Sequence, residues 1–231
     1  MNQEQIVNLT TKSSLVVQFI TGIISTVGLF TKVAEKDKIL VEALGLETIV
    51  QIVEFGFYLS FLTIFNLHDL TISRYYDWLL TTPVMLFTSC LYFYYEETQE
   101  TNNESSRIHL TDFFTEHKST LLLIFLCNLL MLLCGYCTEI GWIDRSTGFV
   151  VGTAFLFTSF GFIYKDFAKY SVKGQQLFMF LLGIWSLYGF AFLLPYMGRN
   201  ISYNLLDIMA KNFFGLFLYF TILRKSSAPK I

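Results

Sequence analysis

The chain has 231 residues, of which 54% are hydrophobic and 15% are charged, and its formal net charge is −2. Soluble domains carry about 25% charged residues, so this composition excludes an ordinary soluble enzyme and predicts a polytopic membrane protein. No basic cluster is present to bind a nucleic acid. The four cysteines lie in or beside apolar segments, where we expect packing residues rather than a disulfide framework or a metal site.

Seven segments are apolar enough to cross a bilayer, which requires about 20 mostly apolar residues. They cover residues 13–31, 39–65, 70–95, 119–138, 147–167, 175–196 and 202–223. We expect helices, because an open strand would leave backbone groups unpaired in lipid. The N-terminus lacks the basic region of a cleaved signal, so the first segment is expected to remain as a span. The predicted fold is an all-α membrane protein, a seven-transmembrane helix bundle forming one domain over residues 1–231, with a polar loop at 96–107.

Basic residues predict the orientation of this bundle. With an extracellular N-terminus, the cytoplasmic side carries Lys32, Lys36, Lys38, Arg107, Lys118, Lys165, Lys169, Lys173, Arg224, Lys225 and Lys230. The opposite side carries Lys12, Arg145 and Arg199. Positive residues gather on the cytoplasmic side of membrane proteins. We therefore expect the N-terminus to be extracellular and the C-terminus to be cytoplasmic.

The seventh segment contains a charged side chain, Lys211, among apolar residues. An ammonium group in hydrocarbon is costly, so such a lysine is a candidate functional residue. Asp207 lies four residues earlier, one helical turn away on the same face, and is a candidate counter-ion. The spacing fits a buried structural ion pair, and it also fits a lysine whose amine forms a Schiff base.

The third segment carries a polar face at helical spacing. Its members are Arg74, Asp77, Trp78, Thr81, Met85 and Thr88. A stripe of this kind inside a membrane must face protein or water. Asp77 is therefore a candidate second carboxylate near Lys211, with Arg74 one turn further out. An Arg74–Asp77 pair at the membrane interface would give the same pattern.

Two motifs resemble the signature of the microbial (type I) rhodopsins. They are Arg74-Tyr-Tyr-Asp-Trp-Leu-Leu-Thr-Thr-Pro83 in the third segment and Asp207-Ile-Met-Ala-Lys211 in the seventh. The resemblance implies all-trans retinal bound covalently to Lys211 as a protonated Schiff base. It implies a retinal pocket comprising Trp78, Thr82, Met85, Met131, Gly135, Trp185 and Tyr188. It also implies a counter-ion and proton-transfer group comprising Asp77, Asp207, Arg74 and Tyr58.

Other positions bear on what the photochemistry drives. Asp77 disfavours a chloride pump, because a fixed carboxylate beside the Schiff base repels the anion. The resemblance places the proton donor of outward pumps eleven residues after the acceptor, where this chain has Thr88. Arg199 stands at one place matching the release carboxylate of such pumps. Reprotonation is therefore expected to be slow or supplied from elsewhere.

The second segment adds a row of polar residues. Glu47, Gln51 and Glu54 follow one another at spacings of four and three, and carboxylates inside a membrane are costly unless they line water. Acidic rows attract cations, so we expect a hydrated ion pathway. The predicted pathway comprises Glu47, Gln51, Glu54, Ser14, Asn204 and Thr88. A proton wire or hydrogen bonds between helices would produce the same row.

This row resembles the glutamate repeat of the channelrhodopsins. Thr82 with Asn128 occupies the position of their gating pair in altered form. The compact chain is most similar to the viral channel-type rhodopsins. The resemblance predicts a retinal-binding photoreceptor, not an enzyme, that acts as a light-gated cation channel. The partners would be the lipid bilayer, monovalent cations or protons, and further copies of the chain in a homo-oligomer.

Two alternatives stay open from the sequence. The first is a slow light-driven outward proton pump. The second is a photosensor that signals to a partner, which the lack of a recognisable signalling domain disfavours. Each places the chain as a multi-pass protein in the plasma membrane or another cellular membrane of the host.

Overall fold

The computed structural model describes residues 3–64, 66–101 and 107–226. Its helices cross the bundle seven times, as predicted. The first six crossings are α1 (Gln3–Gly28), α2 (Lys38–Phe61), α3 (Leu67–Glu100), α4 (Leu110–Glu139), α5 (Arg145–Asp166) and α6 (Val172–Phe192). The seventh joins α7 (Tyr196–Asp207), η3 (Ile208–Asn212) and α8 (Phe213–Ser226). Two short helical turns, η1 (Glu35–Asp37) and η2 (Ala168–Tyr170), lie in connections.

Several helices are longer than the apolar segments that predicted them. Helix α3 continues to Glu100, so the first part of the loop predicted at 96–107 is helical. Residues 102–106 of that loop lie outside the described residues. The same holds for Phe65, the predicted end of the second span. The extension is held by side chains. Tyr92 donates a hydrogen bond of 2.9 Å to Glu96, and Lys173 lies 3.3 Å from the same carboxylate. Apolar runs show which residues of a helix cross the lipid, whereas polar contacts of this kind extend the helix beyond the apolar segment.

Side-chain caps start three of the helices. Asn66 accepts a hydrogen bond of 2.9 Å from the backbone N–H of His68 at the start of α3. Asp144 accepts one of 3.0 Å from Thr147 N–H at the start of α5, and Ser171 accepts one of 2.9 Å from Gly174 N–H at the start of α6. Each cap satisfies a backbone donor that has no partner within its helix. Hydrogen bonds from Thr147 hold the pKa of Asp144 below its usual value.

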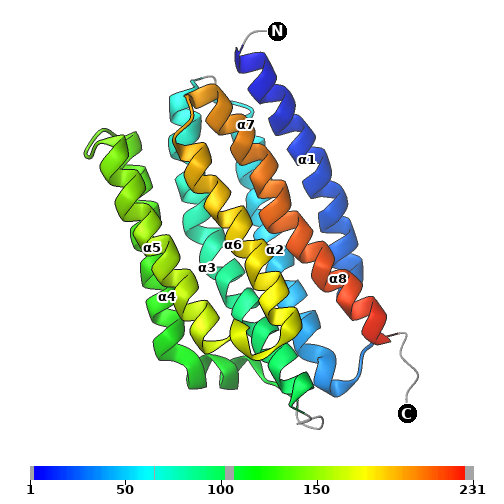
Figure 1. The fold of residues 1–231 in the computed structure, drawn as a ribbon. Helices are drawn as coiled ribbons and strands as arrows, with labels where there is room; N and C mark the ends of the chain where they lie inside the picture. Colours follow the sequence, from blue (N-terminus) through cyan, green and yellow to red (C-terminus); the bar gives the residue numbers. More distant parts are fainter. Residues whose placement is uncertain (1–2, 65, 102–106, 227–231) are drawn as a thin grey trace.

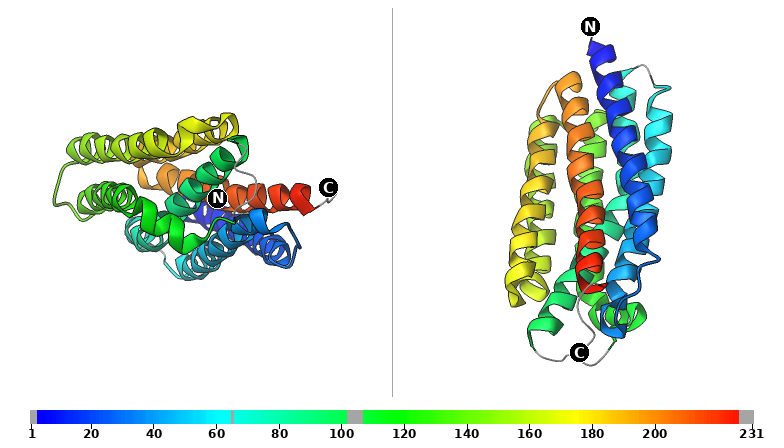
Figure 2. Two further views of the ribbon diagram at one scale, coloured as in Figure 1. Left: turned by 90° about the horizontal axis from the view of Figure 1, so that it is seen from below. Right: turned by 90° about the vertical axis from the view of Figure 1, so that its right-hand side faces the viewer.

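The crossings alternate in direction, so α1 begins and α8 ends at opposite ends of the bundle (Figure 1). We call these the N end and the C end. Helices α4 and α5 form an antiparallel pair on one side, and α1 lies on the other (Figures 1 and 2). Among the described residues, Leu110–Glu139, Arg145–Asp166, Val172–Phe192 and Tyr196–Ser226 are long and apolar enough to span a membrane by length and composition. The chain is a multi-pass membrane protein.

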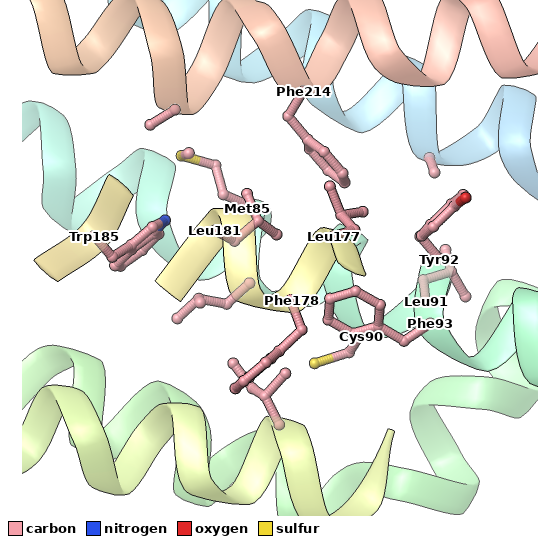
Figure 3. Packing of buried hydrophobic residues seen from close by; sticks show 14 of the residues in the cluster. Met85, Cys90, Leu91, Tyr92, Phe93, Leu177, Phe178, Leu181, Trp185 and Phe214 are labelled. Atoms are coloured by element: carbon pink, nitrogen blue, oxygen red, sulfur yellow. The ribbon is translucent and has the colours of Figure 1, made fainter. Parts of the chain in front are cut away.

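Two kinds of interior fill this bundle. Toward the C end, α3 and α6 interleave apolar side chains such as Phe93, Phe178 and Leu181, with Phe214 of α8 packed nearby (Figure 3). The side where α1, α2 and α8 meet instead buries polar groups, including Ser25, Gln51 and Glu54. The dry and polar halves therefore lie side by side in one bundle.

Close packing of α4 against α5 generates a stability prediction. A Cβ on Gly148 would lie 2.0 Å from Thr138 Oγ1 and 3.2 Å from Thr138 Cβ. Overpacking of this kind costs about 1–3 kcal/mol. We expect Gly148→Ala to lower the apparent melting temperature of the detergent-solubilised protein. Gly161→Ala on the same helix is the control, because a Cβ there meets nothing within 4 Å. Equal melting temperatures for the two variants would contradict the packing argument.

Candidate functional site

Lys211 lies in the middle of the seventh crossing, on the π-helical turn η3. Its side chain is 1% exposed, and Nζ donates a hydrogen bond of 2.7 Å to Asp77 Oδ2. Two more carboxylates approach the same nitrogen, Glu54 Oε1 at 3.8 Å and Asp207 Oδ1 at 4.0 Å. The structure thus brings together Lys211, Asp77 and Asp207 as the sequence predicted. It adds Glu54, which the sequence assigned to the ion pathway alone.

Aromatic side chains from three helices hold Asp207. The Tyr58 hydroxyl of α2 donates to Oδ2 at 2.6 Å, and the Tyr188 hydroxyl of α6 donates to Oδ1 at 2.7 Å. The indole N–H of Trp78 on α3 donates to Oδ1 at 3.3 Å. Hydrogen bonds to a carboxylate are stronger than those between neutral groups, and here both carboxylate oxygens of Asp207 accept them. The orientation of Asp207 is consequently fixed by α2, α3 and α6 together.

Arg74 is completely buried and closes this cluster toward the N end. Its Nη1 lies 3.5 Å from Asp207 Oδ2 and donates to the Tyr58 hydroxyl at 3.2 Å. Its Nε donates to Asn200 Oδ1 at 3.0 Å, and its Nη2 donates to Asn204 Oδ1 at 2.5 Å. A guanidinium has five N–H donors in a rigid fork, and this one uses donors on all three nitrogens.

The two asparagines extend the network to neighbouring helices. The amide of Asn204 donates to Thr10 Oγ1 at 2.8 Å and Thr11 Oγ1 at 3.1 Å, both on α1. The amide of Asn200 donates to Thr71 Oγ1 of α3 at 2.8 Å. Asn204 was predicted in the ion pathway, and the structure makes it a direct partner of Arg74. Asn200 was not predicted as a partner of Arg74, since its spacing of four residues from Asn204 is the one pattern in the sequence that would have pointed to it.

Charge balance constrains this cluster. Arg74 and Lys211 face Asp77, Asp207 and Glu54, and all five side chains are 0–1% exposed. Two cations against three carboxyl groups are neutral only when one carboxyl keeps a proton. A net charge buried away from water is costly. The cluster is therefore suited to hold a proton and to exchange it among neighbouring groups.

A mostly apolar cavity extends from Lys211 between α3, α4, α5 and α6. It is lined by every residue that the sequence assigned to the retinal pocket, namely Trp78, Thr82, Met85, Met131, Gly135, Trp185 and Tyr188. The lining also includes residues that the sequence did not single out, namely Tyr75, Leu132, Gly148, Gly152, Thr153, Leu156, Tyr203 and Ala210. A Cβ on Gly135 would lie 2.5 Å from the Tyr75 hydroxyl oxygen, so glycine leaves room for that ring. The cavity suits a long apolar ligand attached at Nζ.

Thr82 and Asn128 link α3 to α4 beside the cavity. Asn128 Nδ2 donates to Thr82 Oγ1 at 2.8 Å, and Thr82 Oγ1 donates to the Trp78 carbonyl at 2.7 Å. The pair that the sequence singled out is therefore in direct contact. It connects α4 to the backbone of Trp78, whose side chain holds Asp207.

A second polar group lies where α1, α2 and α8 meet, and we call it the polar seam. It comprises Gln18, Ser25, Glu47, Gln51, Glu54 and Asn212. Each has a buried side-chain oxygen or nitrogen without a hydrogen-bond partner among the described residues. Buried polar groups are normally paired with protein or water, so this concentration is unusual. Ser14, predicted for the same pathway, accepts a hydrogen bond of 3.0 Å from Gln18.

Thr88 lies against the seam from α3. Its hydroxyl donates to Glu47 Oε1 and is also close to two carbonyls of its own helix. Thr88 stands where outward pumps have a carboxyl group on this helix, and here the carboxyl group of Glu47 on α2 reaches that position. Asn212, which follows Lys211 in sequence, accepts a hydrogen bond from Thr21 of α1. The sequence did not predict Asn212, because nothing in its local pattern separates it from Lys211.

Arg199 differs most from its expected setting. The sequence placed it among the basic residues of the extracellular side, and the structure shows that its side chain is 1% exposed and forms an ion pair with the buried Glu139 at the end of α4. It also donates to the Leu194 carbonyl at 2.7 Å. Charged residues are seldom buried unless they are paired. Glu139 is 60 residues away in sequence, so no local pattern could have revealed the pair.

Comparisons with known proteins agree with this geometry. The model of the family described as bacteriorhodopsin-like protein matches residues 9–224. The comparison with curated proteins finds no match. The crystal structure of viral rhodopsin OLPVRII is 25% identical, with a TM-score of 0.81, and the match covers 95% of this chain and 98% of that one.

Two more solved structures share the fold at lower identity. The blue light-absorbing proteorhodopsin from Med12 is 18% identical, with a TM-score of 0.73, over 96% of this chain and 99% of that one. The light-driven proton pump LR (Mac) from Leptosphaeria maculans is 15% identical, with a TM-score of 0.68, over 97% and 98%.

The buried Arg74 network generates a prediction about stability. Removing one partner of a buried ion pair costs about 3–5 kcal/mol, because the other charge is left uncompensated. We expect Arg74→Gln to lower the melting temperature of the solubilised protein strongly. Arg107→Gln is the matched control, since Arg107 is 35% exposed in its pairs with Glu35 and Glu42 and surface pairs contribute little. Similar losses in both variants would argue against a stabilising network around Arg74.

Proposed function

The chain belongs to the bacteriorhodopsin-like protein family, and we propose that it is a retinal-binding photoreceptor acting as a light-gated cation channel. The observation that carries the channel assignment is the polar seam. Glu47, Gln51 and Glu54 are 0–2% exposed and have side-chain atoms without a hydrogen-bond partner within the described residues. Such groups are stable in a membrane when water or ions reach them. A row of this kind suits the passage of cations.

Lys211 is the residue that would hold all-trans retinal, as a protonated Schiff base at Nζ. When bound, retinal supplies the absorption of visible light and a light-driven change of shape. The cavity lined by Trp78, Trp185 and Met131 fits the polyene, since it is apolar and begins at the lysine. Asp77 and Asp207 would act as counter-ions at Nζ. The distance of 2.7 Å between Asp77 Oδ2 and that nitrogen supports Asp77 as the proton acceptor.

Polar contacts at the two ends of the bundle support gating by light. We propose that the N end of the bundle is extracellular, in accord with the distribution of basic residues. Arg74 and its asparagine partners then form the outer closure. At the C end, the Tyr95 hydroxyl donates to Asp37 Oδ1 at 2.5 Å, with Lys225 3.9 Å from the same oxygen. Movement of Asp207 would be passed to Arg74, whose Nη1 lies 3.5 Å from Asp207 Oδ2.

A light-driven outward proton pump is the second candidate. The contact between Thr88 and Glu47 favours it, because a carboxyl group from α2 reaches the position of the proton donor in the pumps that the chain resembles. The dry packing of α3 against α6 disfavours a route on that side (Figure 3). In either case, the polar seam is the path on the cytoplasmic side of Lys211.

The visible absorption spectrum tests the assignment of Lys211 as the retinal-binding residue. We expect Lys211→Ala, expressed with added retinal, to lose the visible absorption band, because no other buried amine among the described residues lines the cavity. Lys169→Ala is the control, since Lys169 is exposed and should leave the spectrum unchanged. A Lys211→Ala protein with the wild-type band would overturn the assignment.

Photocurrents at several voltages test what the site drives. A channel current reverses sign with the electrochemical gradient of the cation, whereas a pump current keeps one direction over a wide range. We expect reversal, and we expect Glu54→Gln to change the permeability ratio of protons to sodium severalfold. Glu42→Gln serves as the matched control, because Glu42 lies on the same helix in a partly exposed pair with Arg107. A current of fixed direction would indicate a pump, and no current would favour a photosensor.

A further inference from the structure

Gln51 has an unusual position in the polar seam. Its side chain is 2% exposed, and neither amide atom has a hydrogen-bond partner within the described part of the chain. A buried amide left unpaired costs about 1–3 kcal/mol. Packing against apolar side chains would not repay that cost, so the position calls for a polar occupant of the adjoining space.

Glycines from two helices make room for this amide. A Cβ on Gly215 of α8 would lie 2.2 Å from Gln51 Nε2, which no side chain tolerates without displacing the amide. On α1, a Cβ on Gly22 would lie 3.8 Å from Gln51 Oε1. The amide therefore occupies a notch between α1 and α8 that exists because Gly215 has no side chain.

A hydroxyl faces the same notch. Ser25 is completely buried, its Oγ has no hydrogen-bond partner among the described residues, and it lies 3.4 Å from the Cβ position of Gly215. Along α2, the amide stands between two carboxyl groups, Glu54 three residues later and Glu47 four residues earlier. The amide therefore lies on the same face of α2, beside the direct route from one carboxyl group to the other.

We propose that Gln51, seated in the Gly215 notch, is the constriction that sets the size of the cation admitted through the polar seam. The inference rests on the proposed channel function. Gln51 Oε1 and Ser25 Oγ are neutral oxygen ligands suited to a monovalent cation that has lost part of its water. Carbonyl-type oxygens replace the hydration shell of such ions in selective pores. A cation can pass only when the Gln51 amide swings out of the notch. The space that this movement opens depends on the length of the Gln51 side chain, and that space limits the size of the cation.

Relative permeability to a larger cation tests this role. With methylammonium replacing sodium outside the cell, the reversal potential of the photocurrent gives the permeability ratio. We expect Gln51→Ala to raise the ratio of methylammonium to sodium roughly threefold or more, because the constriction is widened. We expect Gly215→Ala to change the ratio as well, since its Cβ displaces the amide from the notch. Gly56→Ala is the matched control, because a Cβ there meets nothing within 4 Å.

A measurement in the dark separates failure of this inference from failure of the channel function. The purified Ser25→Cys variant would be labelled with a small charged methanethiosulfonate, and the modified peptide would be followed by mass spectrometry. We expect labelling roughly tenfold faster when Gln51→Ala is added, since the amide no longer fills the notch. Unchanged labelling in Gln51→Ala would overturn the inference even without a photocurrent. Unchanged permeability ratios in Gln51→Ala and Gly215→Ala would overturn it in a conducting protein.

Discussion

Two buried cations, Arg74 and Lys211, impose the condition that organises the centre of this protein. Both charges are costly to bury in a membrane interior without nearby carboxylates, and Asp77, Asp207 and Glu54 meet that need from three different crossings. Because the carboxyl groups outnumber the cations, the centre is neutral only when one carboxyl group keeps a proton. Any event that moves the proton or the Lys211 nitrogen changes the balance for all five groups. The cluster therefore links chemistry at one atom to contacts between α2, α3 and α7.

The two halves of the interior are lined by side chains of different chemistry, which come from different helices. The cavity side is lined by rings and methionines that suit an apolar ligand. The seam side contains carboxyl, amide and hydroxyl groups that lack sufficient protein partners. Glu54 belongs to both sides, since it lies in the α2 row and 3.8 Å from Lys211. A change in the cavity can therefore reach the polar seam through that one side chain.

Sequence patterns predicted the seven crossings, because lipid demands long apolar runs, and the family resemblance of two motifs pointed to residues that line one cavity. They predicted helix ends poorly, since α3 is extended by polar contacts such as Tyr92 with Glu96. They missed the Glu139–Arg199 pair and the seating of Gln51 against Gly215, which join residues far apart in the chain. Periodicity reports which residues share a helical face, whereas partners on other helices follow from packing alone.

The π-helical turn at η3 has a geometric effect beyond Lys211. The Phe213 N–H bonds to the Ile208 carbonyl, five residues back, so the seventh crossing contains one more residue than a regular helix would use for that turn. Every residue after the turn is rotated by roughly 100° from its regular place. Gly215 consequently takes the angular position that Phe214 would otherwise hold. Without this single-residue offset, a benzyl ring would face α2 and would take the space that the Gln51 amide occupies.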